Sequence, residues 1–446
     1  MDQSAVKQQE VKIPKRILDA LLLSLSAGVV PRSGAPYIAI GRNEEIAALL
    51  DNLETVENGG AAVRFLIGRY GSGKSFLMQL IRGRALEKDF VTADADLSPE
   101  RKLCGGNGVA TYRELMRNMA CKASPESGAM HTVLSRFYLQ MKQSLVKDGI
   151  LPENNSYNFT LKQRLFSALS SLQSNVGGFD FVTVLGLYYE ACMIENEEQK
   201  SAALRWLRGE YMTKTEAKNG LGFPVSTIIG DDNWYDYVKL WADFSAIAGY
   251  KGLIVFLDEC VNLFKISNRI SREANYEKLL AIFNDTMQGR ATNLGVIFSG
   301  TPQFLEDTRR GLFSYEALKS RLADSRYQEM GFRNMSSPVI RLRTLSANEI
   351  LALLARLTKL WQQKYPSSPV PNAEQMQAFL MDALQRAGAE ELMTPREMIR
   401  NYLSLLAVLR DNPDATFEAS IGTQSAETNE GTAEDDIEGF SDFQLF

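Results

Sequence analysis

The sequence predicts an α/β fold organised around a parallel sheet, and three stretches support this prediction. Residues 68–75 lie between a short apolar run, 63–67, that suits a strand and a segment, 76–81, with helical spacing of its apolar residues. Five consecutive apolar residues, 253–257, precede two carboxylates, as expected of a strand buried on both faces of a parallel sheet. A further apolar run, 294–298, ends at a turn. Strands of this kind, separated by helical segments, indicate an α/β fold.

The composition is that of an ordinary soluble globular protein, with 45% hydrophobic and 23% charged residues. At 446 residues, the chain is long enough for two or three structural units. His131 is the only histidine, which nearly excludes serine-type triads and histidine-based metal sites. The four cysteines form no C-x-x-C pair, which favours a reducing compartment. Any chemistry must therefore rest on carboxylates, lysine, arginine and a metal ion.

Charge is distributed unevenly along the chain. The net charge is −5, but residues 411–446 contain ten acidic residues and no Lys or Arg, so residues 1–410 carry +5. This asymmetry is typical of an interaction tail or of a nucleic-acid surface. The tail ends in an aromatic stretch, 439–446, and its composition cannot form a core, so docking on a partner and disorder without function are both open. No apolar run reaches the 18 residues that a membrane span requires, so no membrane association is expected.

The N-terminal part predicts a helix from Pro14 to just before Gly28, with one apolar side. Pro14 and Asp19 interrupt the run that would otherwise resemble a signal peptide, so secretion is not expected.

A short apolar stretch then stops at Gly41-Arg42, where a second helix begins. Two interpretations are open. Either this is a surface helix with its cap, or Ile38 and Ile40 line an adenine site while Arg42 and Glu45 fix the turn.

Residues 68–75 read Gly-Arg-Tyr-Gly-Ser-Gly-Lys-Ser and fit the pattern G-x-x-x-x-G-K-[ST] without mismatch. Between a strand and a helix, the backbone N–H groups of such a loop and the positive end of the helix face one concavity that suits nucleotide phosphates. Lys74 is expected to reach the β- and γ-phosphates of ATP, and Ser75 to hold Mg²⁺. The predicted nucleotide-binding residues are Ile40, Gly41, Arg42, Gly68, Arg69, Tyr70, Gly71, Ser72, Gly73, Lys74, Ser75 and Phe76.

Two carboxylates, Asp94 and Asp96, end a second predicted strand. They are either catalytic or metal-binding residues or a solvated helix start, and the structural interpretation is favoured because a better pair lies downstream. That pair is Asp258 and Glu259, at the carboxyl end of a buried strand, where parallel sheets bind ligands. Asp258 is expected to hold the Mg²⁺ water shell beside Ser75, and Glu259 to orient and deprotonate the water that attacks the γ-phosphorus.

The next strand ends at the turn 299–302, where a hydroxyl is expected to sense the γ-phosphate. Ser299 and Thr301 compete for this role, and either is also a common turn former.

The window 309–343 is the most basic of the chain. Arg321 lies there in a helix-like segment that suits an arginine finger facing a neighbouring subunit's nucleotide. The alternative is a solvated basic face near DNA phosphates.

The C-terminal part is predicted to be helical, with capping boxes at Ser346/Glu349 and Thr394/Glu397. Arg396 then projects from a helix N-terminus, where a cation is unfavourable unless an anion such as phosphate lies close. Arg396 is therefore a candidate for nucleotide contact, with an ordinary helix-surface arginine as the alternative.

Taken together, these motifs resemble an AAA+ P-loop ATPase of the origin-recognition type. Four segments further resemble the BrxC/BrxD ATP-binding family of BREX phage-defence systems, with BrxD closer in size: Gly41–Glu45, Ile67–Ser75, Ala93–Arg101 and Thr111–Leu115. The resemblance covers residues 14–410 and implies a cytoplasmic bacterial ATPase that acts with defence-system partners, such as a helicase or a DNA-modifying complex. Origin-recognition relatives usually add a C-terminal winged helix, whereas here an acidic stretch follows Arg410, which disfavours DNA contact by that route.

The expected organisation is an AAA+ core with a parallel sheet, a large mostly helical insertion and a C-terminal helical lid. The predicted units are an N-terminal helical segment (1–36), the first part of the core (37–110), the insertion (111–248), the second part of the core (249–344), the lid (345–410) and an acidic disordered tail (411–446).

The predicted function is Mg²⁺-dependent ATP hydrolysis in an oligomer that remodels or recruits a DNA-associated partner complex. The predicted catalytic residues are Lys74, Glu259, Ser299, Thr301, Arg321 and Arg396, and the predicted metal ligands are Ser75 and Asp258. The alternatives are a nucleotide-gated scaffold with little turnover and a DNA-binding loader, for which the basic window is the only support.

Overall fold

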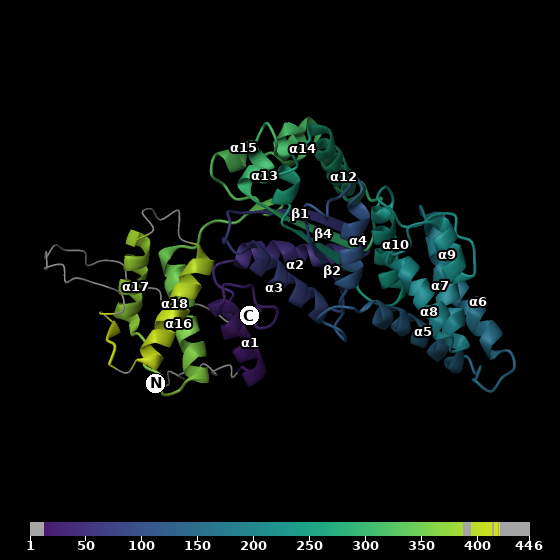
Figure 1. The fold of residues 1–446 in the computed structure, drawn as a ribbon, viewed down its shortest axis with the longest axis horizontal. Coiled ribbons are helices and arrows are strands. Elements are labelled where there is room, and N and C mark those ends of the chain that lie inside the picture. Colours follow the sequence, from purple (N-terminus) through teal and green to yellow (C-terminus); the bar gives the residue numbers. More distant parts are fainter. Residues whose placement is uncertain (1–12, 387–393, 413, 418, 420–446) are drawn as a thin grey trace, which may run out of the picture.

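The computed structural model describes residues 13–386, 394–412, 414–417 and 419, and Figure 1 shows how their helices and strands are arranged. Most of the predicted acidic tail, including its aromatic end, lies outside the described residues. Within the described part of the chain, no helix is both long enough and apolar enough to cross a membrane.

A five-stranded sheet in the order β2-β3-β4-β1-β5 forms the centre of the fold, and all its pairings are parallel. The predicted α/β fold with a parallel sheet is therefore confirmed. The strands are β1 (Ala61–Ile67), β2 (Val91–Asp96), β3 (Leu253–Asp258), β4 (Leu294–Gly300) and β5 (Val339–Arg341). Because all five run in the same direction, the loops that follow them meet at one edge of the sheet.

The strands form where the sequence has short apolar runs, and these runs are buried on both faces of the sheet. On one face, Leu66 and Phe256 pack in a cluster with Leu77 and Ile81 of α3 (Lys74–Glu87) and with residues of α2 (Asn43–Glu57). On the other face, Phe65 stacks on Phe298 with 5.0 Å between ring centroids. The helices α10 (Trp234–Ile247) and α12 (Arg269–Met287) contribute to the core on that face.

The region between β2 and β3 is mostly helical and extends from the sheet to one end of the molecule (Figure 1). Its core is continuous with the core of the sheet, and aromatic residues such as Tyr189, Trp206 and Trp241 are buried in it. Before α10 it contains α4 (Gly108–Arg117), α5 (Met130–Lys147), α6 (Tyr157–Leu169), η2 (Ser170–Ser174), α7 (Gly178–Met193), α8 (Glu197–Leu207) and α9 (Lys214–Leu221).

Short helices connect the last three strands. They are α11 (Val261–Phe264) before α12, then α13 (Pro302–Glu306), η3 (Leu312–Ser314), α14 (Glu316–Leu322) and α15 (Arg326–Glu329) between β4 and β5.

The C-terminal helices form a second cluster at the opposite end of the molecule from the helical region between β2 and β3 (Figure 1). They are α16 (Ala347–Lys364), α17 (Ala373–Arg386) and α18 (Pro395–Asp411). The N-terminal helix α1 (Lys15–Ser26) packs in the same cluster, because its apolar side, including Leu21, meets Leu354 and Leu406. Both predicted capping boxes are present, at the starts of α16 and α18.

Candidate nucleotide-binding site

A cleft open to solvent lies where the carboxyl edge of the sheet meets the C-terminal helical cluster. Ligand sites in open α/β sheets are expected at this edge. Most of the residues predicted for nucleotide binding and catalysis line it: Ile40, Arg42, Tyr70, Gly71, Ser72, Gly73, Lys74, Ser75, Phe76, Asp258, Glu259, Ser299, Thr301 and Arg396. Gly41, Gly68, Arg69 and Arg321 do not line the cleft.

The glycine-rich loop joins β1 to α3, and its glycines are required by its shape. Gly71 and Gly73 have φ angles of +73° and +94°, a region that residues with a side chain rarely adopt. A Cβ atom at Gly68 would lie 2.5 Å from the Ser72 hydroxyl oxygen, and one at Gly71 would lie 2.7 Å from Thr394 at the start of α18. The loop is thus closely packed against the C-terminal helices.

Lys74 is the first residue of α3, and its side chain folds back over the loop. Its Nζ donates hydrogen bonds to the carbonyl oxygens of Gly68 and Arg69, each at 2.9 Å. Burial lowers the pKa of this ammonium group, while the nearby carboxylates of Asp258 and Glu259 raise it. The oxygen atoms of a bound phosphate can therefore replace these two carbonyl oxygens as acceptors of the Lys74 hydrogen bonds.

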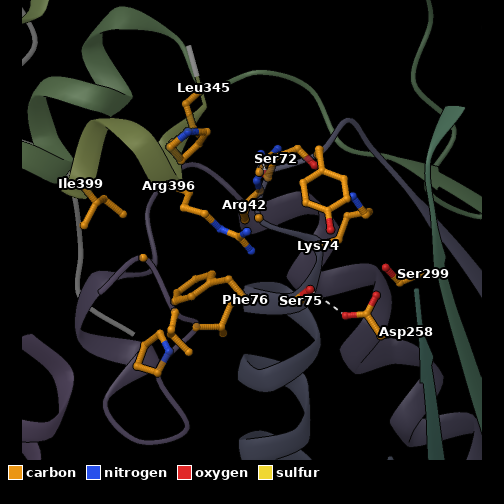
Figure 2. A pocket seen from close by; sticks show the side chains of 18 of the residues that line it. Arg42, Ser72, Lys74, Ser75, Phe76, Asp258, Ser299, Leu345, Arg396 and Ile399 are labelled. Carbon is orange, nitrogen blue, oxygen red and sulfur yellow. Dashed lines mark hydrogen bonds between the residues drawn. The ribbon is translucent and has the colours of Figure 1, made fainter. Parts of the chain in front are cut away.

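Ser75 and Asp258 lie side by side in the cleft, where Figure 2 marks the hydrogen bond between them. The Ser75 hydroxyl donates a hydrogen bond of 2.6 Å to Asp258 Oδ2, and the other carboxylate oxygen accepts one of 2.7 Å from the Glu259 backbone N–H. A hydroxyl and a carboxylate oxygen are ligands that suit Mg²⁺, which usually takes one or two protein ligands beside water and phosphate oxygens. Among the described residues, no group of three or more His, Cys, Asp or Glu side chains is placed to hold a metal ion. The pair thus fits a nucleotide-bound Mg²⁺ rather than a metal caged by protein alone.

Glu259 has a strained backbone, with a φ angle of +54°. Residues other than glycine tolerate this conformation at a cost of about 1–3 kcal/mol, and such residues cluster at functional sites. Burial raises the pKa of its carboxyl group, and the charge of Asp258 adds to the shift. A carboxylate with a raised pKa is a better base for accepting a proton from water.

The two carboxylates at the end of β2 differ from each other. Asp94 lies inside β2 and accepts a hydrogen bond of 3.1 Å from Arg82 Nε. It is therefore not the solvated helix start that the sequence suggested, because the next helix, α4, begins only at Gly108. Asp96 is the register partner of Asp258 on the neighbouring strand, and burial, followed by the charge of Asp258, raises the pKa of its carboxyl group. The sequence pattern did not indicate this neighbour, because strand register cannot be read from an apolar run.

The structure separates the two candidate hydroxyls at the end of β4. Ser299 is fully buried, and its hydroxyl has no hydrogen-bond partner. Figure 2 shows its side chain beside that of Asp258. The Thr301 hydroxyl instead caps α13 by accepting a hydrogen bond of 3.3 Å from the Phe304 N–H. Of the two, Ser299 is the one with a free hydroxyl at the cleft.

One end of the cleft is apolar. Ile38 and Ile40, the predicted walls of an adenine site, line it together with Phe76. The sequence analysis did not identify the remaining walls, which come from the end of α1 and the segment after it, from the stretch before α16, and from α16 and α18: Leu25, Val29, Val30, Pro31, Leu345, Leu353 and Ile399. An apolar run after a helix stop at Gly28 was visible in the sequence, but nothing there indicates that it returns to the glycine-rich loop.

The two candidate arginines occupy different places. Arg396 lines the cleft at the start of α18, and Figure 2 shows its side chain extending toward Phe76. Arg321 lies on α14 away from the cleft, where it donates hydrogen bonds to Asn284 Oδ1 at 3.1 Å and to the Ala317 carbonyl at 2.7 Å. Arg321 therefore does not act on the cleft of its own subunit.

The fold has a parallel sheet, a glycine-rich loop between a strand and a helix, and a serine–aspartate pair beside that loop. These features are compatible with the core of a P-loop NTPase. The chain belongs to the BREX system ATP-binding protein BrxC/D family, whose family model matches residues 13–425. The predicted resemblance to this family is confirmed, and membership indicates a role in phage defence with ATP binding. No curated protein matches the chain.

Proposed function

We propose that the protein binds ATP with Mg²⁺ in the cleft and hydrolyses the γ-phosphate, as an AAA+ ATPase acting in BREX-type defence. The observation that carries the proposal is the 2.6 Å hydrogen bond between Ser75 and Asp258, with Glu259 next in the chain. It brings the end of the glycine-rich loop and the end of β3 together although they are 183 residues apart in sequence. This is the juxtaposition that phosphoryl transfer to water requires.

Each residue has a role in the proposed reaction. The loop N–H groups and Lys74 bind the β- and γ-phosphates, and Ser75 and Asp258 hold Mg²⁺. When bound, the metal ion neutralises charge on the phosphate oxygens. Glu259 orients the attacking water and accepts its proton, and its raised pKa supports this role. Ser299 donates its hydroxyl to the γ-phosphate, and Arg396 contributes a positive charge from the helical lid.

The proposed assembly is an oligomer in which Arg321 completes the site of a neighbouring subunit. Its exposed position on α14, outside its own cleft, supports action on another subunit's nucleotide. Hydrolysis would then depend on subunit contact and would be coupled to remodelling or recruiting a DNA-associated partner complex.

A nucleotide-gated scaffold is the second candidate function. It is favoured by the position of the cleft between the sheet and the C-terminal helical cluster, because ATP binding alone would change how these two parts meet. A DNA-binding loader is supported by three exposed cations, Arg309, Lys319 and Arg326. Within the described part of the chain, none of the three forms an ion pair.

The decisive experiment compares wild-type protein with Glu259→Gln. We expect the variant to retain ATP binding and to lose phosphate release by about 10²-fold or more, because a general base commonly contributes 10²–10⁴-fold. Wild-type hydrolysis in Glu259→Gln would refute the role of Glu259. ATP-dependent change in molecular mass without phosphate release from the wild type would select the scaffold instead. A loader predicts salt-sensitive DNA affinity of the ATP-loaded protein.

A further inference from the structure

Arg42 is a buried arginine at the start of α2, only 5% exposed, and it contacts three separate parts of the chain. Its Nη2 donates hydrogen bonds to the Ser72 carbonyl at 3.0 Å and to the Arg343 carbonyl at 2.8 Å. Its Nη1 lies 3.5 Å from Glu45 Oε1, and Glu45 is 1% exposed. One side chain thus joins the glycine-rich loop to residues 342–346, the linker between β5 and α16.

The bond to Ser72 fixes the orientation of a peptide group in the loop. Because the peptide unit is planar and trans, the Ser72 carbonyl and the Gly73 N–H point in opposite directions. Holding the carbonyl on the Arg42 side directs the Gly73 N–H to the other side of the peptide plane. Gly73 lines the cleft, where such N–H groups bind phosphate.

The bond to Arg343 fixes the linker to the C-terminal helices. The Arg343 side chain pairs with Glu349, with one hydrogen bond of 2.5 Å, and Glu349 also accepts a hydrogen bond of 2.7 Å from the Ser346 N–H at the start of α16. Gly41 is packed against the same carboxylate, since a Cβ there would lie 2.6 Å from Glu349 Oε1. Arg42 therefore holds the linker through the backbone carbonyl of Arg343, and Glu349 holds it through the Arg343 side chain.

We infer that Arg42 is a positioning residue that couples the orientation of the glycine-rich loop to the position of the C-terminal helical cluster, so that ATP binding orders the 342–346 linker. The inference rests on the proposed function, because it requires ATP in the cleft. Arg42 acts through two backbone carbonyls, not through the phosphates. Lysine cannot replace it, because Nη2 of the rigid guanidinium bonds both carbonyls while Nη1 faces Glu45, and the single nitrogen of an ammonium group cannot occupy both positions.

The test measures binding of a non-hydrolysable ATP analogue with Mg²⁺ to the full chain, together with hydrogen exchange of the linker at saturating analogue. Arg42→Lys should bind the analogue roughly ten- to a hundredfold more weakly, as expected for lost hydrogen bonds from a charged donor. At saturation, the wild type should protect residues 342–346 from exchange and the variant should not. A structural role alone would alter exchange equally with and without the analogue.

The matched control is Arg333→Lys. Arg333 is an exposed arginine that forms an ion pair with Glu44, a residue of α2. Such surface ion pairs contribute little to stability. Its affinity and linker protection should equal those of the wild type.

A second variant approaches the coupling from the linker side and covers the case in which Arg42→Lys does not fold. Glu349→Gln weakens the hold on Arg343 without touching the cleft lining, and it should lower analogue affinity severalfold. Unchanged affinity in Glu349→Gln, or in folded Arg42→Lys, overturns the inference, as does linker protection that persists in Arg42→Lys. A wild type that fails to bind the analogue overturns the proposed function and the coupling with it.

Discussion

Gly71 in the glycine-rich loop and Thr394 at the start of α18 are in such close contact that no side chain fits between them. A Cβ atom at Gly71 would lie 2.7 Å from Thr394 Cβ, and the φ angle of +73° already disfavours any other residue. The contact sets how closely the C-terminal helices approach the phosphate end of the cleft.

Gly71→Ala is therefore expected to push α18 away from the loop and to weaken ATP binding by about tenfold or more, because both the strain and the clash act on the binding conformation. Titration of ATP with the purified variant checks this. Adding Thr394→Gly removes the clash but not the strain, so the double variant should recover part of the affinity. Gly83→Ala is the control, since a Cβ there meets nothing within 4 Å; it should leave binding unchanged and stabilise α3 by about 0.5–1 kcal/mol.

Ser299 and Thr301 are expected to respond in opposite ways to removal of their hydroxyls. Ser299→Ala removes a buried hydroxyl without a partner, so stability should hold or rise while the hydrolysis rate falls on the order of ten- to a hundredfold. Thr301→Ala removes the cap of α13 and should lower the free energy of unfolding by about 1 kcal/mol, with a smaller effect on rate. Measuring the ATP hydrolysis rate and the thermal unfolding temperature of both variants distinguishes the two roles. The assignment of the sensing hydroxyl to Ser299 fails if Thr301→Ala has the larger loss of rate.

In the proposed oligomer, Arg321 of one subunit acts at the same active site as Glu259 of its neighbour. Arg321→Ala should therefore reduce hydrolysis by about 10³–10⁵-fold, although its own cleft is intact. Mixing Arg321→Ala with Glu259→Gln should restore measurable activity, because a subunit with an intact Glu259 can receive an intact Arg321 from its neighbour. Phosphate release is measured as a function of the mixing ratio. A mixture no more active than its components argues against action between subunits.

Glu259 is expected to reduce the stability of the folded protein in a pH-dependent way. Folding raises the pKa of the Glu259 carboxyl group, so the folded state disfavours its charged form. The resulting loss of stability is fully present at pH values above the raised pKa of the folded state. It is absent at pH values below the pKa of the unfolded state. Glu259→Gln should therefore unfold at a higher temperature than the wild type near pH 7. The difference should disappear as the pH falls through the raised pKa to the ordinary range for a glutamate. Thermal unfolding scans of both proteins at several pH values test this, and a difference that stays constant with pH contradicts it.

Local features of the fold could be predicted from the sequence because they depend on neighbouring residues. The strand at 253–258 was indicated by its apolar run, and the capping boxes at Ser346 and Thr394 by residues three positions apart. The glycine-rich loop was recognisable because its shape restricts which residues fit.

Contacts between distant segments could not be predicted in the same way. The hydrogen bond from Arg42 to the Arg343 carbonyl spans 301 residues, and it uses a backbone atom that every residue has. Asp96 and Asp258 are neighbours only because β2 pairs with β3 in a particular register. The apolar side of α1 predicted burial, but periodicity shows that a face is buried and not which partner covers it.

The packing of α1 against α18 has a consequence for how the protein is made. The cleft takes its walls from Leu25 and Val29 near one end of the family match and from Pro395 and Ile399 near the other. During translation, the glycine-rich loop leaves the ribosome more than 300 residues before Ile399 does. A nascent chain therefore holds a phosphate loop without a finished pocket, and high-affinity capture of ATP must wait until the segment that carries Ile399 has been made and has packed against α1.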